Sequence, residues 1–508
     1  MTESAEHKRS KLEPFVWFAL TFGVYLALAS PTFYKTDGPD LFWLFDEHRQ
    51  HPWHLGYLPL FRGWHWVLHL FSADVSLMRV GTSFSALGMA IGVSSFVAGL
   101  QRLGISAGRR DTAAILLAAG PGALLFATVV ELHAPLMAMA GIAFWWTTVQ
   151  VQRPSWAGVL LLGVLTHGCF VMHSSGLLLP GWLLPFFLAR RMPAGRRDWL
   201  LAAAAGFVHA LLWFALPRLF PSLYGLHADL AAAFAKETSI NRPQSVDYAG
   251  EIFVQEWLWP LMPVSVLCFA AALRRELRAE FVAFAVGMGP FLYLCVRQLV
   301  HEPENGAYLL PMTMPAVLLT VQALRPRVSV AAAVLGAMVA LLSLGSVVPF
   351  YQALDDGTES RRLVHNLEAA AQQKPFLALF GTHREMSTGY EALVRWNGPP
   401  VVPSRSFLYI RETAAKPRAD YIRANEGAGI VGVLQSLIAA DVAVLVPERT
   451  RSYLAEPGAF MRAEKATAEV PPDMAGPQLL RDLEAAFTFV PGSEAGDGDA
   501  RVFRLQPK

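Results

Sequence analysis

Charge is scarce in this chain: only 16% of its 508 residues are Asp, Glu, Lys or Arg, whereas a soluble globular chain carries about a quarter. Cysteine is scarcer still, with three residues that all lie in apolar segments, so no disulfide framework is expected. No Gly-rich phosphate loop follows a predicted strand, which argues against a nucleotide site. No basic aromatic patch indicates a nucleic-acid partner.

Long apolar runs are what the sequence has instead. Runs of roughly 18 or more residues recur through the first 350 positions, and each can cross about 30 Å of hydrocarbon. The sequence therefore predicts a polytopic α-helical membrane protein with about eleven transmembrane helices. We interpret 157–189 as a hairpin, because one straight helix of that length would overshoot the bilayer. The expected spans are 14–31, 80–100, 112–130, 133–150, 157–172, 175–189, 199–217, 256–273, 279–297, 309–324 and 328–350.

Basic residues gather in alternate loops, for example at 109–110 and 196–197. The positive-inside rule then places the N-terminus in the cytoplasm. The loops 32–79 and 218–255, and everything after about residue 351, are expected outside. The sequence thus predicts an integral plasma (inner) membrane protein, and the first apolar run is too long for a cleavable signal peptide.

Composition changes at Tyr351, where charge and turn residues become frequent. We therefore expect a transmembrane domain at 1–350 and a soluble extracytoplasmic α/β domain at 351–508, long enough for its own core. The expected elements of that domain are a helix at 361–373, strands at 375–381 and 442–447, helices at 431–440 and 478–487, and a closing hairpin across 489–505.

The loop after the first span carries an acidic and histidine-rich cluster. Carboxylates beside lipid are costly unless they are paired, solvated or in use. Asp37 and Asp40 are three residues apart and could face one site, where one of them takes a proton from an acceptor. They could equally cap a helix or be solvated. His51 and His54 could share a helical face and bind a metal. A divalent metal stays an open option, and no cofactor is certain.

Polar residues also mark the other expected outer loops. Glu131 and His133 lie between the third and fourth spans, and His173 lies at the tip of the 157–189 hairpin. A single outer-edge histidine is more often solvated than functional, but polar tips recur on this side only. The sequence therefore places the function at the outer face. The remaining candidates, in the later loops, are Arg242, Arg297, His301 and Tyr308.

Two stretches of the first loop carry a motif: Asp-Gly-Pro-Asp-Leu at Asp37–Leu41 and His-Pro-Trp-His-Leu-Gly-Tyr-Leu-Pro-Leu at His51–Leu60. They resemble the GT-C superfamily of membrane glycosyltransferases, nearest the branch related to protein O-mannosyltransferases. That branch reads Asp-Ser-Gly-Glu-Phe and then His-Pro-Pro-Gly-Tyr-Pro-Leu. Asp40 therefore replaces a glutamate, and two residues are inserted before Gly-Tyr.

Further matches follow in the same order along the chain, over roughly 30–315. Arg79–Ala86 is similar to Arg-Val-Asn-Leu-Phe-Ser-Ala, Glu131–Pro135 to Glu-Val-Tyr-Ala-Leu, and Met172–His173 to Asn-His. Ala307–Pro311 is similar to Arg-Tyr-Leu-Leu-Pro, with Ala307 where a basic residue is common.

The resemblance implies a mannosyltransferase-like enzyme that moves a sugar from a polyprenyl-phosphate donor to a protein, glycan or lipid acceptor. It implies Asp37 as the base, with Asp40 as the alternative. The residues implied to bind the donor or its phosphate are Arg297, His301, Tyr308, His173 and Arg242, and those implied to bind or support the acceptor are Glu131, His133, His51 and His54.

Two other classes stay open. A transporter or lipid flippase would also be polytopic, but it would carry charges buried in mid-span and paired broken helices. A scaffold that displays the C-terminal domain would not need acidic residues in the first loop.

Overall fold

The computed structural model describes most of the chain before residue 221 and selected segments after it. The described residues are 2–30, 37–46, 48, 50–51, 54–72, 75–220, 262–298, 309–324, most of 328–338, parts of 363–380, 407–409, 429–455, 475–492 and 501–508. They form two compact units. The first comprises Met1–Pro31, Gln50–Val75 and Arg79–Phe350, and the second Thr32–Arg49, Ser76–Met78 and Tyr351–Lys508. The units divide at the residue where composition changes, but the first half of the first loop groups with the second unit.

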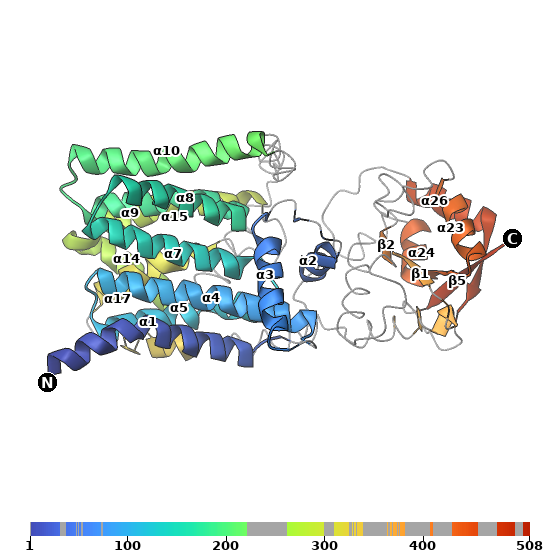
Figure 1. The fold of residues 1–508 in the computed structure, drawn as a ribbon, viewed down its shortest axis with the longest axis horizontal. Coiled ribbons are helices and arrows are strands. Elements are labelled where there is room, and N and C mark those ends of the chain that lie inside the picture. The colour runs from blue at the N-terminus through green and yellow to red at the C-terminus, as the bar shows by residue number, and fades with distance from the viewer. Residues whose placement is uncertain are drawn as a thin grey trace. The chain divides into compact units, whose positions relative to one another are not determined.

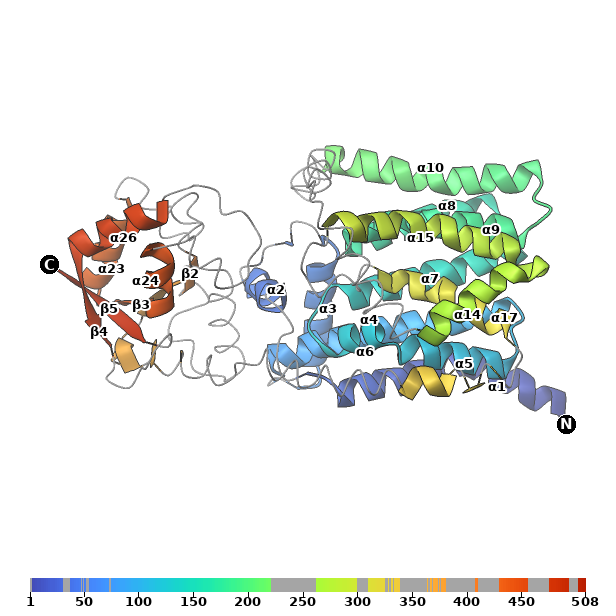
Figure 2. The same ribbon diagram turned by 180° about the vertical axis from the view of Figure 1, so that it is seen from behind.

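The first unit is a bundle of long helices that lie side by side, with α3 running across their ends (Figures 1 and 2). Its α-helices are α1 (Thr2–Ala27), α3 (Tyr57–His69), α4 (Leu77–Arg102), α5 (Ala107–Ala118), α6 (Pro121–Thr128), α7 (His133–Gln152), α8 (Trp156–Met172), α9 (Pro180–Arg190), α10 (Arg196–Leu219), α14 (Met262–Leu273), α15 (Arg278–Gln298) and α17 (Thr313–Ala323). Short 3₁₀ helices are η1 (Ser174–Leu178), η4 (Arg275–Leu277) and η5 (Leu310–Met312).

Three described helices, α4, α7 and α10, are long and apolar enough to cross a membrane, and a fourth span results if α5 and α6 count together. Helices also occupy the other expected segments, but they are shorter or only partly described, so eleven spans stay a prediction. The expected span at 112–130 is not one straight helix: α5 and α6 are bent by 63°. The break falls at Gly120 and Pro121, and proline cannot continue the backbone hydrogen bonding of a preceding helix.

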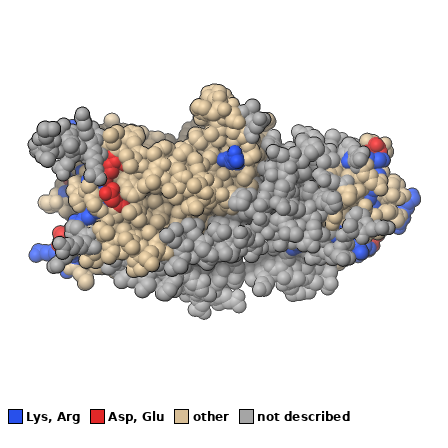
Figure 3. Space-filling model, turned by 90° about the horizontal axis from the view of Figure 1, so that it is seen from below, with Lys and Arg blue, Asp and Glu red and all other residues tan. Residues whose placement is uncertain are grey.

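Arginines gather at one end of the bundle, where alternate helix ends meet. The Arg191 guanidinium donates to the Val151 carbonyl (2.8 Å), and that of Arg109 to the Leu324 carbonyl (2.8 Å). Arg190 forms an ion pair with Glu280 across α9 and α15 at 2.9 Å. We call this the basic end. Figure 3 shows charged side chains toward the left end of the bundle and a nearly uncharged described surface along its length.

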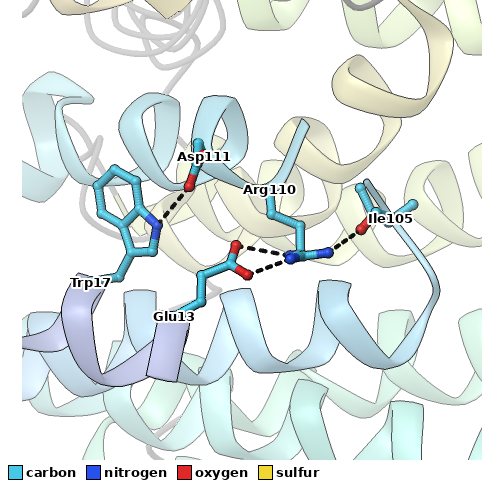
Figure 4. A network of polar contacts seen from close by, with 5 residues as sticks. All are labelled: Glu13, Trp17, Ile105, Arg110 and Asp111. Carbon is cyan, nitrogen blue, oxygen red and sulfur yellow. Dashed lines mark hydrogen bonds and ion pairs between the residues drawn. The ribbon is translucent and has the colours of Figure 1, made fainter. Parts of the chain in front are cut away.

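A half-buried polar network fixes α1 to α5 at the basic end (Figure 4). The Arg110 guanidinium donates two hydrogen bonds to the Glu13 carboxylate and a third to the Ile105 carbonyl. The Trp17 indole donates to Asp111 at 3.1 Å. Paired in this way, a carboxylate and a guanidinium can lie beside apolar helices without an unsatisfied charge.

Glycines let α4 and α7 approach backbone to backbone. A Cβ on Gly141 would lie 2.6 Å from the Gly92 carbonyl oxygen, and one on Gly92 would lie 2.7 Å from the Met137 carbonyl oxygen. No side chain fits at either position without moving a helix. Small residues at such contacts are typical of helix pairs in membranes.

The second unit contains a five-stranded mixed sheet in the order β2-β1-β3-β5-β4. β2, β1 and β3 are parallel, and β5 and β4 complete the sheet in antiparallel pairing. Its elements are α2 (Asp37–Asp46), β1 (Phe376–Phe380), β2 (Phe407–Tyr409), α23 (Gly429–Ala439), β3 (Ala443–Pro447), α24 (Glu448–Ala455), α26 (Ala475–Ala486), β4 (Phe487–Pro491) and β5 (Val502–Pro507).

Both faces of this sheet are buried. Leu377 and Leu379 of β1 face the cluster that contains Leu434 of α23 and Leu483 of α26. Phe376 and Ala378 of β1 belong to a separate cluster on the opposite face, together with Leu363, Leu367, Ala370 and Ala371. Alternate residues of a strand point to opposite faces, so an apolar run with no polar alternation is what a two-sided core requires. The expected strands at 375–381 and 442–447 and the closing hairpin thus correspond to β1, β3 and β4–β5.

Candidate functional site: a row of histidines at one end of the bundle

The structure describes only some of the predicted site residues. Asp37 and Asp40 lie in the first turn of α2, and Arg297 lies in α15, but their side chains fall outside the described part of the chain. Arg242, His301 and Tyr308 lie wholly outside the described residues. The predicted site residues with described side chains are His51, His54, Glu131, His133 and His173, which all belong to the first unit.

Four of these five residues form a continuous row of imidazole rings. His51 stacks on His54, and His54 stacks on His173, each with ring centroids 4.5 Å apart. His133 also contacts His173, with ring centroids 4.5 Å apart, and the ring of Phe126 lies 5.0 Å from His133. We call these four histidines the histidine row. Residues more than 120 positions apart in the sequence therefore share one site.

Three chain segments meet to build the row. His51 and His54 precede α3, His133 is the first residue of α7, and His173 follows α8. A backbone hydrogen bond from Gly56 N–H to the Val171 carbonyl (2.9 Å) holds the start of α3 against the end of α8. A Cβ on Gly56 would lie 2.7 Å from the Met172 sulfur, so this contact favours glycine.

The expected helical pairing of His51 with His54 is wrong in its geometry. Neither residue is helical in the structure. Instead, the backbone N–H of His54 donates to Nδ1 of His51 at 3.1 Å, which forms a turn and stacks the two rings. The residues between them include a proline, which lacks the N–H that a helix interior would use.

Hydrogen bonds fix the tautomer of His173. Its Nδ1 accepts the backbone N–H of Ser175 at 3.2 Å, and the Ser175 hydroxyl lies 2.8 Å from the same nitrogen. A neutral ring whose Nδ1 accepts must carry its proton on Nε2. Burial, with a smaller contribution from His51, lowers the pKa of His173 to about 3. The centre of the row is therefore an uncharged N–H donor at neutral pH.

Glu131 is a buried carboxylate beside the row. Its side chain is fully buried, and its Oε2 accepts the backbone N–H of Leu132 at 2.8 Å. Burial, followed by the negative charge of Glu131, raises the pKa of Tyr57. Tyr57 is itself fully buried in α3, and no described residue hydrogen-bonds its hydroxyl.

Tyr57 was not among the predicted site residues, although it stands in the Gly-Tyr pair of the first-loop motif. A tyrosine next to glycine is ordinary in a sequence. Only its burial next to Glu131 distinguishes it, and the sequence does not encode that distance in a local pattern.

The described residues do not form a metal centre from three or more His, Cys, Asp or Glu side chains. His51, His54 and His173 stack face to face, and His133 is tilted by 41° to His173. The row offers the Nε2–H of His173, and Glu131, two residues before His133, is a buried carboxylate. Such a set can donate hydrogen bonds to a phosphate and accept one from a hydroxyl.

Sequence comparisons give no relative: no protein-family profile and no curated protein matches this chain. Among solved structures, the chain is similar to the crystal structure of ArnT from Cupriavidus metallidurans bound to undecaprenyl phosphate. The similarity covers 97% of each chain, with a TM-score of 0.58 and 13% sequence identity. At that identity the likeness is one of fold, so the chain has an ArnT-like membrane-protein fold.

Proposed function

We propose that the protein is a GT-C-type glycosyltransferase that moves a sugar from a polyprenyl-phosphate donor to an acceptor. The transfer takes place at the end of the bundle that carries the histidine row, on the outer face of the membrane. The observation that carries the proposal is the shared fold with a protein whose structure holds undecaprenyl phosphate. The stretches between Asp37 and Pro311 that resemble the superfamily support the same proposal.

The histidine row favours phosphate binding at its end of the bundle. The Nε2–H of His173 is the kind of neutral donor that binds a lipid phosphate without placing a full charge beside hydrocarbon. In this proposal Arg242, Arg297, His301 and Tyr308 supply further donor contacts. His51, His54, Glu131 and His133 support His173 or bind the acceptor.

The reaction then needs one base. The acceptor oxygen attacks the anomeric carbon, its proton passes to Asp37, and the bond between that carbon and the phosphate oxygen breaks. The lipid keeps the phosphate, whose new charge is stabilised by the donors around it. Asp40, one turn along α2, is the alternative base.

The test is transfer from radiolabelled polyprenyl-phosphate sugars by purified protein in membranes, comparing the wild type with Asp37→Asn. Loss of a positioned base costs about 10²–10⁴ in rate. Asp46→Asn, at the far end of the same helix, is the matched control and is expected to keep transfer. Donor binding is expected to survive Asp37→Asn, because the base contacts the acceptor.

Two results would contradict the proposal. Wild-type protein that moves labelled lipid across the membrane without transferring sugar would be a flippase. Near-normal turnover in Asp37→Asn, Asp40→Asn and the double variant would leave the acidic loop without a catalytic role.

A further inference from the structure

Four arginines at the basic end take no part in the contacts that hold the helices together. Arg102 ends α4, Arg153 follows α7, and Arg196 and Arg197 begin α10. All four are exposed, and none forms an ion pair or donates a side-chain hydrogen bond to a described residue. The other arginines of the same segments, which are less exposed, are all bonded to carbonyl or carboxylate oxygens.

Hydrogen bonds place the chain segments of these arginines next to one another. The Gln152 side chain donates to the Arg102 carbonyl, which joins the end of α7 to the end of α4. The Arg191 guanidinium donates to the Val151 carbonyl at 2.8 Å, which joins the connection before α10 to the end of α7. Helices α8 and α10 pack side by side from there (Figures 1 and 2). The four exposed guanidinium groups therefore belong to adjacent segments.

Little negative charge balances these arginines. The segments 99–110, 150–156 and 190–200 contain a single acidic residue, Asp198. Its carboxylate already forms an ion pair with Arg191, and Arg197 interacts with it only through its charge. Several unpaired positive charges on one surface attract anions from solution or from the membrane. The charge of these segments therefore suits an anionic partner.

Two exposed tryptophans lie beside the arginines. Trp156 is the first residue of α8 and Trp199 lies in the first turn of α10, and their side chains are 51% and 56% exposed. Tryptophan is enriched where a membrane protein meets the lipid headgroups, because its ring is apolar and its N–H can stay hydrated. From these tryptophans as far as Phe214, every exposed side chain of α8 and α10 is apolar.

We propose that this surface binds the headgroup of an anionic phospholipid, whose acyl chains lie along the exposed faces of α8 and α10. We call it the arginine–tryptophan patch; it consists of Arg102, Arg153, Arg196, Arg197, Trp156 and Trp199. A guanidinium donates two parallel hydrogen bonds to phosphate oxygens, and basic groups between helix ends are typical sites for anionic headgroups.

The apolar faces favour a lipid over a soluble anion, because they begin within one turn of the arginines and would cover acyl chains but not a free phosphate. The patch lies at the end of α8 opposite His173, which follows the helix. It is thus separate from the histidine row and does not depend on the proposed transfer activity.

The experiment uses the full-length protein, purified in an uncharged detergent. Native mass spectrometry measures the binding of phosphatidylglycerol and of phosphatidylcholine with the same acyl chains. The variants are Arg153→Gln and the double variant Arg196→Gln with Arg197→Gln. Arg275→Gln is the matched control: Arg275 is an exposed arginine of η4, next to the helix that carries Glu280 at the basic end, and neither η4 nor α15 contains a tryptophan.

The wild type is expected to bind phosphatidylglycerol more tightly than phosphatidylcholine. That preference should fall about fivefold for each arginine removed from the patch, and by less than about twofold in Arg275→Gln. Binding of phosphatidylcholine should not change, and circular dichroism should show the same helix content in every variant.

Three results would overturn the proposal. Equal binding of the two lipids by the wild type would show that the patch does not select an anionic headgroup. An equal loss in Arg275→Gln would mean that the basic end attracts anions without a defined site. Displacement of phosphatidylglycerol by an equal concentration of glycerol 3-phosphate, which has no acyl chains, would mean that the ligand is a soluble anion.

Discussion

Burial fixes the charge state of His173, the residue at the centre of the histidine row. Its pKa is lowered to about 3 by desolvation and by His51, while an exposed histidine in the unfolded chain titrates at about 6.5. Between about pH 3 and pH 6.5, the unfolded state therefore binds a proton at His173 that the folded state does not bind. Above pH 6.5 both states are neutral, and stability is unaffected. Below it, protonation favours unfolding, and the loss grows until the pH reaches about 3.

The low pKa of His173 predicts that the free energy of unfolding depends on pH. Between pH 7.5 and pH 5, wild-type protein should lose about 2 kcal/mol of stability through His173. His173→Gln should remove that part of the loss, so its unfolding midpoint should change less with pH. His48→Gln, at an exposed position, should follow the wild type. The measurement is denaturant unfolding in detergent at pH 7.5, 6 and 5. Equal pH slopes for the wild type and His173→Gln would show that the ring is solvated.

The candidate residues were predictable, but their contacts were not. Glu131, His133 and His173 are recognisable as polar residues at loop tips between apolar runs. That His133 and His173 meet depends on helix order in space, which no local pattern gives. Tyr57 was missed for the same reason, since its distinguishing property is burial beside Glu131.

At the scale of elements, the α4–α7 contact makes the sharpest prediction. Gly141→Ala places a Cβ where the Gly92 carbonyl now lies, so the helices must separate. Overpacking of this kind costs typically about 1–3 kcal/mol. Gly63→Ala in α3 is the matched control: a Cβ there meets nothing within 4 Å. Alanine at a helix interior is favoured over glycine by about 0.8–1 kcal/mol, so this control should stabilise.

Thermal unfolding of the two glycine variants in the same detergent tests the contact. The midpoint should fall for Gly141→Ala and stay level or rise for Gly63→Ala. A midpoint for Gly141→Ala at or above that of the wild type would mean that α4 and α7 are not in backbone contact.

Elements followed from the sequence where one physical signal dominated. Apolar runs located α4, α7 and α10 to within a few residues, and the two-sided apolar runs at 376–380 and 443–447 located β1 and β3. The span expected at 112–130 was wrong as a single helix. Gly120 and Pro121 break it, although its hydrophobicity alone favours one continuous crossing.

At the scale of the whole molecule, the uneven distribution of arginine predicts the orientation. Basic loops are retained in the cytoplasm, so the basic end should face inward. Reporter fusions should give a cytoplasmic signal after Arg110, Arg197 and Arg327, and an external signal after Asp40, Tyr248 and Lys508. A cytoplasmic signal at Lys508 would place the C-terminal domain and every candidate site on the wrong side.

Composition predicts a domain boundary at Tyr351, because charge returns there and the apolar runs end. The grouping of Thr32–Arg49 with the second unit could not be predicted, since a loop between two spans carries no signal for the unit that it joins.

Two hydrogen bonds hold helix α3 against its neighbours. The first runs from the Gly56 N–H to the Val171 carbonyl, and the second, from the Trp64 indole to the Ser83 hydroxyl at 2.9 Å, lies two turns along the helix. His69 is at the other end of the helix, roughly 20 Å from Gly56 at 1.5 Å per residue. The first bond joins residues that are two positions from His54 and two positions from His173. A rotation of α3 about that bond would therefore change the stacking of those two rings.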